Sequence, residues 1–343
     1  MIGIRVDAND IIAMGHLMRC MSIAQHFDNG NSEIKFIVSE QNAKIFVEEK
    51  GFECICLDND YKSKDSEIEQ MAGIFQKYEI SQLLIDSYEV TPKYMEALKK
   101  YVKLIYIDDI NKFRYPAEVI INYTYGTDMT LYKKWKYDTA KFCLGSKYVP
   151  LRQEFGKERI GIRQDIQSVF LTTGGTDQYG IIRNMLKEMQ KTKLKDVQKN
   201  VVLGRFYKDR EYLDEMAYSD ESIKIYQNIS NICDVMRKSD IAISAGGTTL
   251  AELCACGIPT VCFSVADNQL NGTKAYSADG LMVYAGDVRD NKKNIVNEII
   301  HNVEKLAEDY DLRENMSRAA KEAIDGKGAL RIAEIIRTCC PYH

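Results

Sequence analysis

The chain has 343 residues and a formal net charge of −4, with 45 % hydrophobic and 28 % charged residues. This composition is typical of a folded globular protein and excludes a disordered chain, a collagen-like fibre and a coiled coil. A slightly acidic chain also lacks the basic surface that nucleic-acid-binding proteins carry. The length is about twice that of a usual domain, so we expect two domains.

The N-terminal sequence Met1–Asp7 has the pattern of a strand and not that of a secretory signal. The sequence contains no run of about 18 apolar residues that could span a membrane. The ten cysteines lie mostly in apolar runs and none has C-x2-C spacing, so we expect reduced thiols rather than disulfides or a metal centre. These features predict a cytoplasmic protein without stable membrane insertion and without nucleic acid as a partner.

The first half of the chain alternates short β-branched runs with longer amphipathic stretches. Strands are expected at residues 2–6, 34–38, 54–57, 82–86, 103–107 and 118–122. Helices are expected at residues 16–28, 41–50, 64–78 and 92–100. This alternation predicts βαβ units that build a parallel sheet with helices on both faces.

A second alternating series follows a charged stretch at residues 151–166, where we place the crossover between an N-terminal domain (1–155) and a C-terminal domain (156–343). Its strands are expected at residues 168–172, 200–203, 222–226, 240–244, 260–263 and 281–284. Its helices are expected at residues 178–191, 230–238, 248–256 and 268–278, with two closing helices within 290–338. The predicted fold class is α/β, with two doubly wound Rossmann-like domains and a ligand cleft between them.

Two strand-to-helix turns in the expected C-terminal domain carry paired glycines. Glycines let a phosphate approach the backbone, and the start of a helix offers unpaired N–H groups and a positive dipole end. Threonines at such a turn can cap the helix or bind a phosphate oxygen. The alternative is a tight turn with an ordinary capped helix. The residues of these turns are Gly174, Gly175, Gly246, Gly247, Thr248 and Thr249.

Four further polar residues lie near these turns. Glu252 comes one turn into the helix that follows Thr249, where its carboxylate could bind a ribose diol or simply be solvated. Asp267, Asn268 and Gln269 follow the strand expected at 260–263 and would face the same crevice. The alternative for Asp267 is a helix cap.

The expected N-terminal domain offers one candidate base. His16 follows the first strand, at the start of the next helix, and Gly15 and Arg19 are expected to line the substrate site beside it. A helix N-terminus disfavours imidazolium, so His16 would stay neutral and able to accept a proton. Asp7 could orient the imidazole or serve as an alternative base. The alternative for His16 is that it only caps or packs at the helix start.

Carboxylates also end two later strands of this domain. Asp86 ends one strand and is followed by Tyr88, and the pair Asp108–Asp109 ends the next. Carboxylates at strand ends are common in α/β clefts, but they also cap loops. The aspartate pair lacks a third ligand at a recognisable spacing, so we expect no metal site there.

These motifs, in this order, resemble one family. They are similar to those of the UDP-2,4-diacetamido-2,4,6-trideoxy-β-L-altropyranose hydrolases of pseudaminic acid biosynthesis and of the related spore-coat polysaccharide proteins (PseG/SpsG-like proteins). The resemblance covers roughly residues 2–285. It is carried by Ile4–Asp7, Gly15–Cys20, Ile85–Tyr88, Ile107–Asp109, Leu144–Tyr148, Leu151–Phe155, Gly174–Asp177, Ser244–Thr249, Glu252 and Asp267–Gln269.

The resemblance implies the two-domain GT-B architecture, similar to that of the lipid II-forming N-acetylglucosaminyltransferase, with UDP held mainly by the C-terminal domain. Gly246–Thr249 would then hold the diphosphate and Glu252 the ribose, with Asn268–Gln269 near the phosphates or the sugar. The resemblance also implies that His16 activates water for attack at the anomeric carbon, with Tyr88 beside it in the site.

The sequence departs from the family pattern at two places. Ala13 and Met14 stand before Gly15, where the family usually has a further glycine. Asp267 takes the place of the commoner glutamate before Asn-Gln. Both departures bear on the choice of sugar more than on the chemistry.

Together the motifs and the resemblance predict a hydrolase that releases UDP from a UDP-linked diacetamido-trideoxy sugar with inversion. No cofactor or metal is expected, because the helix start after Gly247 can stabilise the leaving diphosphate. The alternative is a GT-B glycosyltransferase of polysaccharide biosynthesis, in which His16 deprotonates a sugar hydroxyl. A non-catalytic nucleotide-sugar-binding module is a third possibility, disfavoured by the presence of His16.

Overall fold

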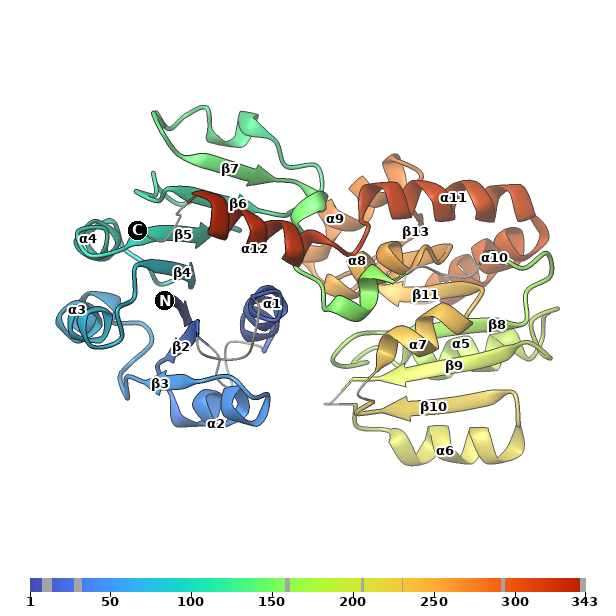
Figure 1. The fold of residues 1–343 in the computed structure, drawn as a ribbon. Coiled ribbons are helices and arrows are strands. Elements are labelled where there is room, and N and C mark those ends of the chain that lie inside the picture. Colours follow the sequence, from blue (N-terminus) through green and yellow to red (C-terminus); the bar gives the residue numbers. More distant parts are fainter. Residues whose placement is uncertain are drawn as a thin grey trace. The chain divides into compact units, whose positions relative to one another are not determined.

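A computed structural model describes residues 1–7, 14–27, 33–157, 161–204, 207–229, 231–290 and 294–339. The chain forms two compact units, each built on one parallel sheet (Figure 1). Unit 1 comprises Met1–Gln153 together with Lys327–His343, and unit 2 comprises Glu154–Gly326. The α/β class and the two parallel sheets expected from the alternating sequence pattern are confirmed.

Unit 1 contains a seven-stranded sheet in the order β3-β2-β1-β4-β5-β6-β7. Helices α1, α2 and α12 cover one face of this sheet, and α3 and α4 cover the other (Figure 1). Its strands are β1 (Ile2–Val6), β2 (Ile34–Val38), β3 (Cys54–Cys56), β4 (Gln82–Asp86), β5 (Lys103–Ile107), β6 (Val119–Asn122) and β7 (Lys141–Leu144). Its helices are α1 (Gly15–Ala24), α2 (Gln41–Glu49), α3 (Ile68–Lys77), α4 (Pro92–Leu98) and α12 (Gly328–Cys339).

Unit 2 contains a six-stranded sheet in the order β10-β9-β8-β11-β12-β13. Helices α5 and α10 bury their apolar faces against one side of it, and α7 and α8 pack against β8 and β11 (Figure 1). Its strands are β8 (Ser168–Thr172), β9 (Gln198–Leu203), β10 (Ile223–Gln227), β11 (Ile241–Ala245), β12 (Thr260–Ser264) and β13 (Val283–Asp287). Its helices are α5 (Ile181–Met189), α6 (Arg210–Ser219), α7 (Ile232–Lys238), α8 (Thr248–Cys256), α9 (Asp267–Ala278), α10 (Ile295–Glu308) and α11 (Tyr310–Ala323).

The central strands of unit 1 are buried on both faces of the sheet. Ile2, Ile4 and Val6 of β1 point into the core beneath α1 and α12. In β4, Leu83 and Ile85 point into the opposite core beneath α3 and α4. Because successive side chains of a strand point to opposite faces, the burial of every residue of β1 and β4 means that both strands are covered on both sides.

The closing segment differs from the expectation of two helices. Three helices occur, because the carboxylate of Asp309 caps the start of α11 by accepting from the amide of Leu312 at 2.8 Å, and the backbone turns at Gly326 with a φ of +74°. The last of them, α12, was expected in the C-terminal domain. It instead buries Ile332 and Ile336 in the core of unit 1. An amphipathic pattern tells that one helix face is buried, but not against which sheet.

In each sheet the strand order reverses between two neighbouring strands. These are β1 and β4 in unit 1, and β8 and β11 in unit 2. Open α/β sheets bind ligands outside the carboxyl ends of their strands at such a reversal. We therefore expect ligand-binding residues at the carboxyl ends of β1 and β4 and at those of β8 and β11.

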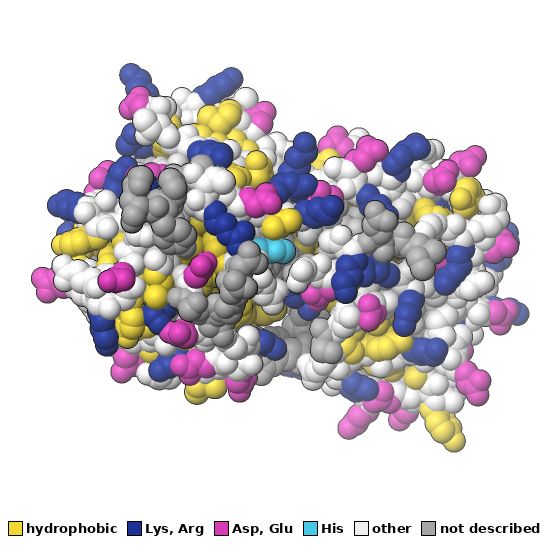
Figure 2. All heavy atoms as spheres, in the orientation of Figure 1, with side chains coloured by type: hydrophobic (Ala, Val, Ile, Leu, Met, Phe, Trp, Pro, Cys, Tyr) yellow, Lys and Arg dark blue, Asp and Glu magenta, His cyan; other side chains and the backbone are white. Residues whose placement is uncertain are grey.

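No helix in the described part of the chain is long and apolar enough to cross a membrane. Figure 2 shows acidic and basic side chains intermixed over the face that it presents, with hydrophobic side chains in small patches.

Candidate functional site

His16 and Asp86 meet at the carboxyl ends of the two central strands of unit 1. The parallel pairing of β1 with β4 places Val6 beside Asp86, and α1 begins at Gly15. The Nδ1 atom of His16 lies 2.6 Å from the Oδ1 atom of Asp86. A carboxylate only accepts hydrogen bonds, so Nδ1 donates to Asp86 in this pair and Nε2 is the ring nitrogen left for another partner. The Nη2 atom of Arg19 also lies 3.0 Å from Nδ1.

Arg19, one turn further along α1, binds the same carboxylate. Its Nε and Nη2 atoms donate to Asp86, its Nη1 donates to Asp109 at 2.9 Å, and it also contacts the hydroxyl of Tyr123. Burial of Asp86 would raise its pKa, but the charge of Arg19 and the hydrogen bonds from Arg19 and His16 lower it overall. Asp86 is therefore ionised beside His16. The guanidinium that was expected to line the substrate site is thus engaged by two carboxylates.

Tyr88 lies against the other side of the imidazole. Its ring meets the ring of His16 edge-on, with the centroids 4.7 Å apart and an interplanar angle of 83°. Its hydroxyl donates to the Oδ2 atom of Asp109 at 2.8 Å. Burial and the charge of Asp109 raise the pKa of Tyr88, so the hydroxyl keeps its proton. The side chain is 40 % exposed, which leaves part of its ring available to a ligand.

Asp7 has different partners from those expected. Its carboxylate binds Arg5 at 2.6 Å and Lys64 at 2.7 Å, and accepts from the hydroxyls of Ser39 and Ser87. Burial would raise the pKa of Asp7, but the two cations lower it to about 2. The carboxylate in contact with His16 is that of Asp86. The missing signal is strand adjacency, because β1 and β4 are neighbours in the sheet but far apart in the sequence.

The aspartate pair at the end of β5 is also engaged by protein groups. Asp108 accepts from the amides of Ile110 and Asn111 and from the hydroxyl of Tyr132. Asp109 accepts from Arg19 and Tyr88, as described above. Within the described ranges, no three His, Cys, Asp or Glu side chains are grouped as metal ligands would be.

In unit 2, the turn after β11 has a conformation that requires glycine. Gly247 has φ +146° and ψ −169°, a region closed to residues with a Cβ atom. It occupies the N-cap position of α8, where it has no side chain to cap the first amides of the helix. Thr248 is exposed and Thr249 half-buried in the first turn. The start of α8 thus offers backbone N–H groups and hydroxyls to an anion.

The turns after β11 and β12 are packed closely together. A Cβ atom on Gly246 would lie 2.8 Å from the Cβ of Gln269, so only glycine allows this approach. The Oε1 atom of Gln269 accepts from the amide of Val265 at 2.9 Å and holds the turn before α9. Asp267 is the first residue of α9 and pairs with Arg289 at 2.8 Å, rather than capping the helix. Asn268 beside it is exposed.

The turn after β8 completes this edge of the sheet. Gly174 has a φ of +81°, and Gly204, at the end of β9, packs directly against its carbonyl. Asp177 accepts from the amides of Ile181 and Ile182 and so begins α5. Gly175 lies exposed in the same turn, and Glu252 is half-buried on α8. The structure therefore gathers the predicted turns of unit 2 at the carboxyl ends of β8, β11 and β12.

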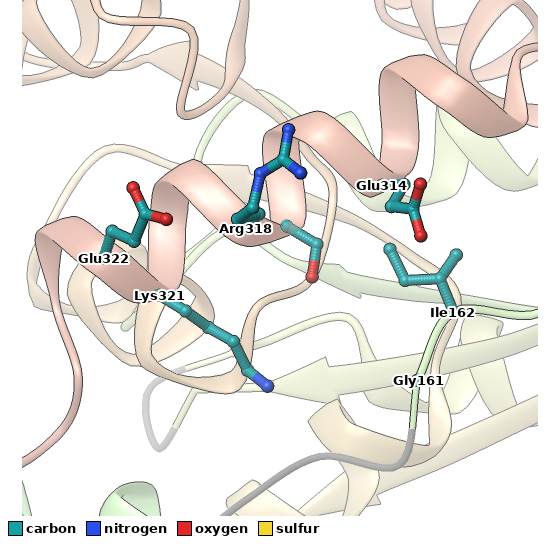
Figure 3. Close-up of a pocket in the computed structure, with 7 residues that line it drawn as sticks. Gly161, Ile162, Glu314, Arg318, Lys321 and Glu322 are labelled. Carbon is teal, nitrogen blue, oxygen red and sulfur yellow. The ribbon is translucent and has the colours of Figure 1, made fainter.

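A pocket of about 460 Å³ lies elsewhere in unit 2, along α11 (Figure 3). Acidic and basic side chains alternate around it, and none of the residues discussed above lines it. Its lining residues are Gly161, Ile162, Glu314, Ser317, Arg318, Lys321 and Glu322.

Comparison with known sequences identifies distant relatives. Residues 168–331 match the glycosyltransferase family 28 C-terminal domain. The spore coat polysaccharide biosynthesis protein SpsG of Bacillus subtilis is 21 % identical over 98 % of this chain and 97 % of its own length. The UDP-2,4-diacetamido-2,4,6-trideoxy-β-L-altropyranose hydrolase of Campylobacter jejuni is 20 % identical over 72 % of this chain and 85 % of its own length.

An uncharacterized protein of Methanocaldococcus jannaschii is 28 % identical over 76 % of this chain. The match covers 54 % of that protein, so the chain spans about half the length of this relative. The chain is thus a distant relative of SpsG and of the Campylobacter hydrolase, as its motifs predicted.

Comparison with solved structures shows the fold. MurG of Acinetobacter baumannii superposes with a TM-score of 0.70 at 10 % identity, covering 98 % of this chain and 99 % of MurG. The UDP-GlcNAc 2-epimerase of Neisseria meningitidis, solved with UDP-GlcNAc bound, gives 0.67 at 12 % identity, covering 98 % of this chain and 99 % of the epimerase. The chain has the GT-B fold. The glycosyltransferase family 28 match falls on the second GT-B domain and continues into α12, the helix that returns to unit 1.

Proposed function

We propose that the protein is a nucleotide-sugar hydrolase that releases UDP from a UDP-linked diacetamido-trideoxy sugar. The pairing of His16 with the ionised Asp86 carries the proposal. It leaves Nε2 of the imidazole to act as the proton acceptor, next to the partly exposed ring of Tyr88. The relationship to the Campylobacter hydrolase, named for such a substrate, supports this choice of sugar.

In the proposed reaction, Nε2 of His16 takes one proton from water as the water oxygen attacks C1 of the sugar. The bond between C1 and the phosphate oxygen breaks, and UDP leaves with the bonding electrons. Attack from the opposite side inverts the configuration at C1. Residues Gly246–Thr249 bind the leaving diphosphate through backbone N–H groups at the start of α8, and Glu252 binds the ribose.

The test is incubation of the purified protein with the UDP-sugar in ¹⁸O-labelled water and without any acceptor. We expect UDP and free sugar in equal amounts, the inverted anomer by NMR, and the label in the sugar and not in UDP. His16→Ala should lower kcat by about 10²–10⁴-fold while UDP still binds. His301→Ala, on the exposed side of α10, is the matched control and should leave kcat unchanged. Unchanged UDP release by His16→Ala would refute the proposal.

The second candidate is a GT-B glycosyltransferase in polysaccharide biosynthesis. The family 28 match over residues 168–331 and the similarity to MurG favour it. His16 would then deprotonate a sugar hydroxyl in place of water. This candidate predicts negligible UDP release without acceptor and rapid release when an acceptor sugar is supplied.

A further inference from the structure

We propose that Ser87 is a positioning residue for His16. The hydrogen bond from Ser87 to Asp7 fixes the backbone between Asp86 and Tyr88. It thereby fixes the carboxylate and the ring that contact the imidazole of His16. The inference rests on the proposed function, in which His16 is the base.

Ser87 lies between two residues that contact His16. Asp86 binds Nδ1 and Tyr88 packs edge-on against the ring. β4 ends at Asp86, and Tyr88 lies in the turn that follows Ser87. Successive side chains at the end of a strand point to opposite faces, so Ser87 points away from the side of Asp86. Its hydroxyl donates to Asp7 at 2.7 Å, and it is 3 % exposed.

Two further hydrogen bonds hold the Ser87 peptide. The Ser87 hydroxyl accepts from the amide of Glu89 at 3.2 Å, and the Ser87 carbonyl accepts from the hydroxyl of Tyr106 at 3.1 Å. The backbone that carries Asp86 and Tyr88 is therefore fixed from the face opposite to His16. A rotation of this peptide would move both Asp86 and Tyr88 relative to the imidazole.

Asp7, which accepts the hydrogen bond of Ser87, is itself held by a buried network of charged side chains. Asp7 binds the Arg5 guanidinium at 2.6 Å and the Lys64 ammonium at 2.7 Å. Arg5 in turn donates to both oxygens of Glu67, at 2.8 and 2.9 Å. The side chains of these four residues are almost fully buried, and their two positive and two negative charges balance. A buried network with its hydrogen bonds satisfied is rigid, so Asp7 provides a fixed point.

Ser39 offers a matched control for Ser87. Its hydroxyl also donates to Asp7, at 3.1 Å, and it is equally buried at 3 % exposure. It comes directly after β2, and its hydroxyl bonds Asp7 and Arg5 rather than the Asp86–Tyr88 segment. Ser39→Ala and Ser87→Ala both remove a hydroxyl that donates to Asp7, and Ser39→Ala also removes an acceptor of Arg5 Nη2, at 2.7 Å. Only Ser87→Ala releases the segment that holds His16.

The experiment compares kcat, KM and thermal stability of these two variants with the wild type. We expect Ser87→Ala to lower kcat by about 10- to 100-fold with KM unchanged, since small misplacements of a catalytic group carry such costs. Ser39→Ala should keep the wild-type kcat although its melting temperature falls similarly. The ¹⁵N NMR spectrum of His16 should show the Nδ1–H tautomer in the wild type and in Ser39→Ala, and a mixture of tautomers in Ser87→Ala.

His16→Ala separates the two proposals. If His16→Ala retains activity, the proposed function fails, whatever Ser87→Ala does. If His16→Ala is inactive while Ser87→Ala matches Ser39→Ala in kcat and in the His16 spectrum, the positioning role is overturned and the proposed function stands. The NMR comparison needs no substrate, so it decides the inference about Ser87 even before the sugar is identified.

Discussion

The Nδ1 atom of His16 lies 2.6 Å from Oδ1 of Asp86, and the Asp86 carboxylate also accepts from the guanidinium of Arg19. One buried side chain thus orients the imidazole while Arg19 keeps that side chain ionised. An asparagine amide could not accept from both His16 and Arg19. Its NH2 group is a donor, and it would face either the donors of Arg19 or the Nδ1–H group of His16.

Asp86→Asn tests this relationship. The amide would leave His16 free to turn or to change tautomer, so kcat should fall by about 10²–10⁴-fold. UDP affinity, measured by calorimetry, should be unchanged, because the proposed nucleotide-binding turns are all in unit 2. Glu48→Gln, a carboxylate on the exposed side of α2, serves as the control and should keep full activity. Wild-type kcat in Asp86→Asn would show that Asp86 does not orient the base.

Tyr88 contributes a hydroxyl and a ring, and two variants separate them. Tyr88→Phe removes the hydrogen bond to Asp109, which retains Arg19 as a partner. A net hydrogen bond is worth about 0.5–1.5 kcal/mol, so kcat/KM should fall by about tenfold at most. Tyr88→Ala also removes the edge contact with His16, worth about 0.5–1.5 kcal/mol more, and should lose correspondingly more activity. Steady-state kinetics of both variants make the comparison, and equal losses would assign the whole effect to the hydroxyl.

The architecture followed from local patterns in the sequence. Alternating apolar runs and amphipathic stretches predict parallel sheets with helices on both faces, and paired glycines before a helix predict a tight turn at a strand end. Gly247 is an example. Its φ of +146° is a backbone conformation that favours glycine, so the glycine in the sequence already indicates the turn. Likewise, the place of His16 at the start of α1 follows from its position after the first strand.

The partner of His16 could not be predicted in the same way. Which carboxylate reaches the imidazole depends on strand order, and β1 pairs with β4 across many intervening residues. The sequence places Asp7 much closer along the chain than Asp86, but the side chain of Asp7 turns to Arg5 and Lys64. Sequence distance is a poor guide to contact in a doubly wound sheet.

Two elements of the structure, α6 and β7, were not expected from the sequence, because their hydrophobic periodicity is weak. Among the residues of α6, Leu213 is buried and Tyr218 is 93 % exposed, so its apolar face is narrow. β7 begins with the exposed Lys141 at the edge of the sheet. Short edge strands and helices with one buried position do not show the periodicity on which sequence prediction depends.

Glycine substitutions at the start of α8 should disturb the proposed diphosphate site. Gly247→Ala places a Cβ atom in a conformation closed to it, at a cost of about 1–3 kcal/mol in the free energy of unfolding. UDP affinity should fall by about tenfold or more, because relief of this strain moves the first amides of α8. Gly246→Ala should disturb the same site by displacing α9, because the new Cβ atom would lie 2.8 Å from the Cβ of Gln269.

Gly272→Ala is the control for both glycine variants. Gly272 lies within α9, and a Cβ atom there would meet nothing within 4 Å. This variant should keep UDP affinity and raise the free energy of unfolding by about 0.5–1 kcal/mol. Urea unfolding and calorimetry measure both quantities. Full UDP affinity in Gly247→Ala would place the nucleotide elsewhere.

The lowered pKa of Asp7 predicts that the free energy of unfolding decreases at acid pH. Its pKa is lowered from 3.8 to about 2 in the folded protein by Arg5 and Lys64, against the opposing effect of burial. A group with a depressed folded-state pKa stabilises the protein above its unfolded pKa and loses that contribution as the pH falls through the folded one. The lowering corresponds to about 2 kcal/mol, lost between about pH 4 and pH 2.

The measurement is urea unfolding of the wild type and of Asp7→Asn across that range. Asp7→Asn should be less stable than the wild type near neutral pH, and the difference in the free energy of unfolding should shrink by about 2 kcal/mol as the pH falls to about 2. Other carboxylates titrate in both proteins and cancel in the difference. NMR titration of the Asp7 carboxyl carbon in the wild type gives the same pKa directly, without a variant. A midpoint near 3.8 would mean that Arg5 and Lys64 only offset the cost of burying the Asp7 carboxylate and do not lower its pKa overall.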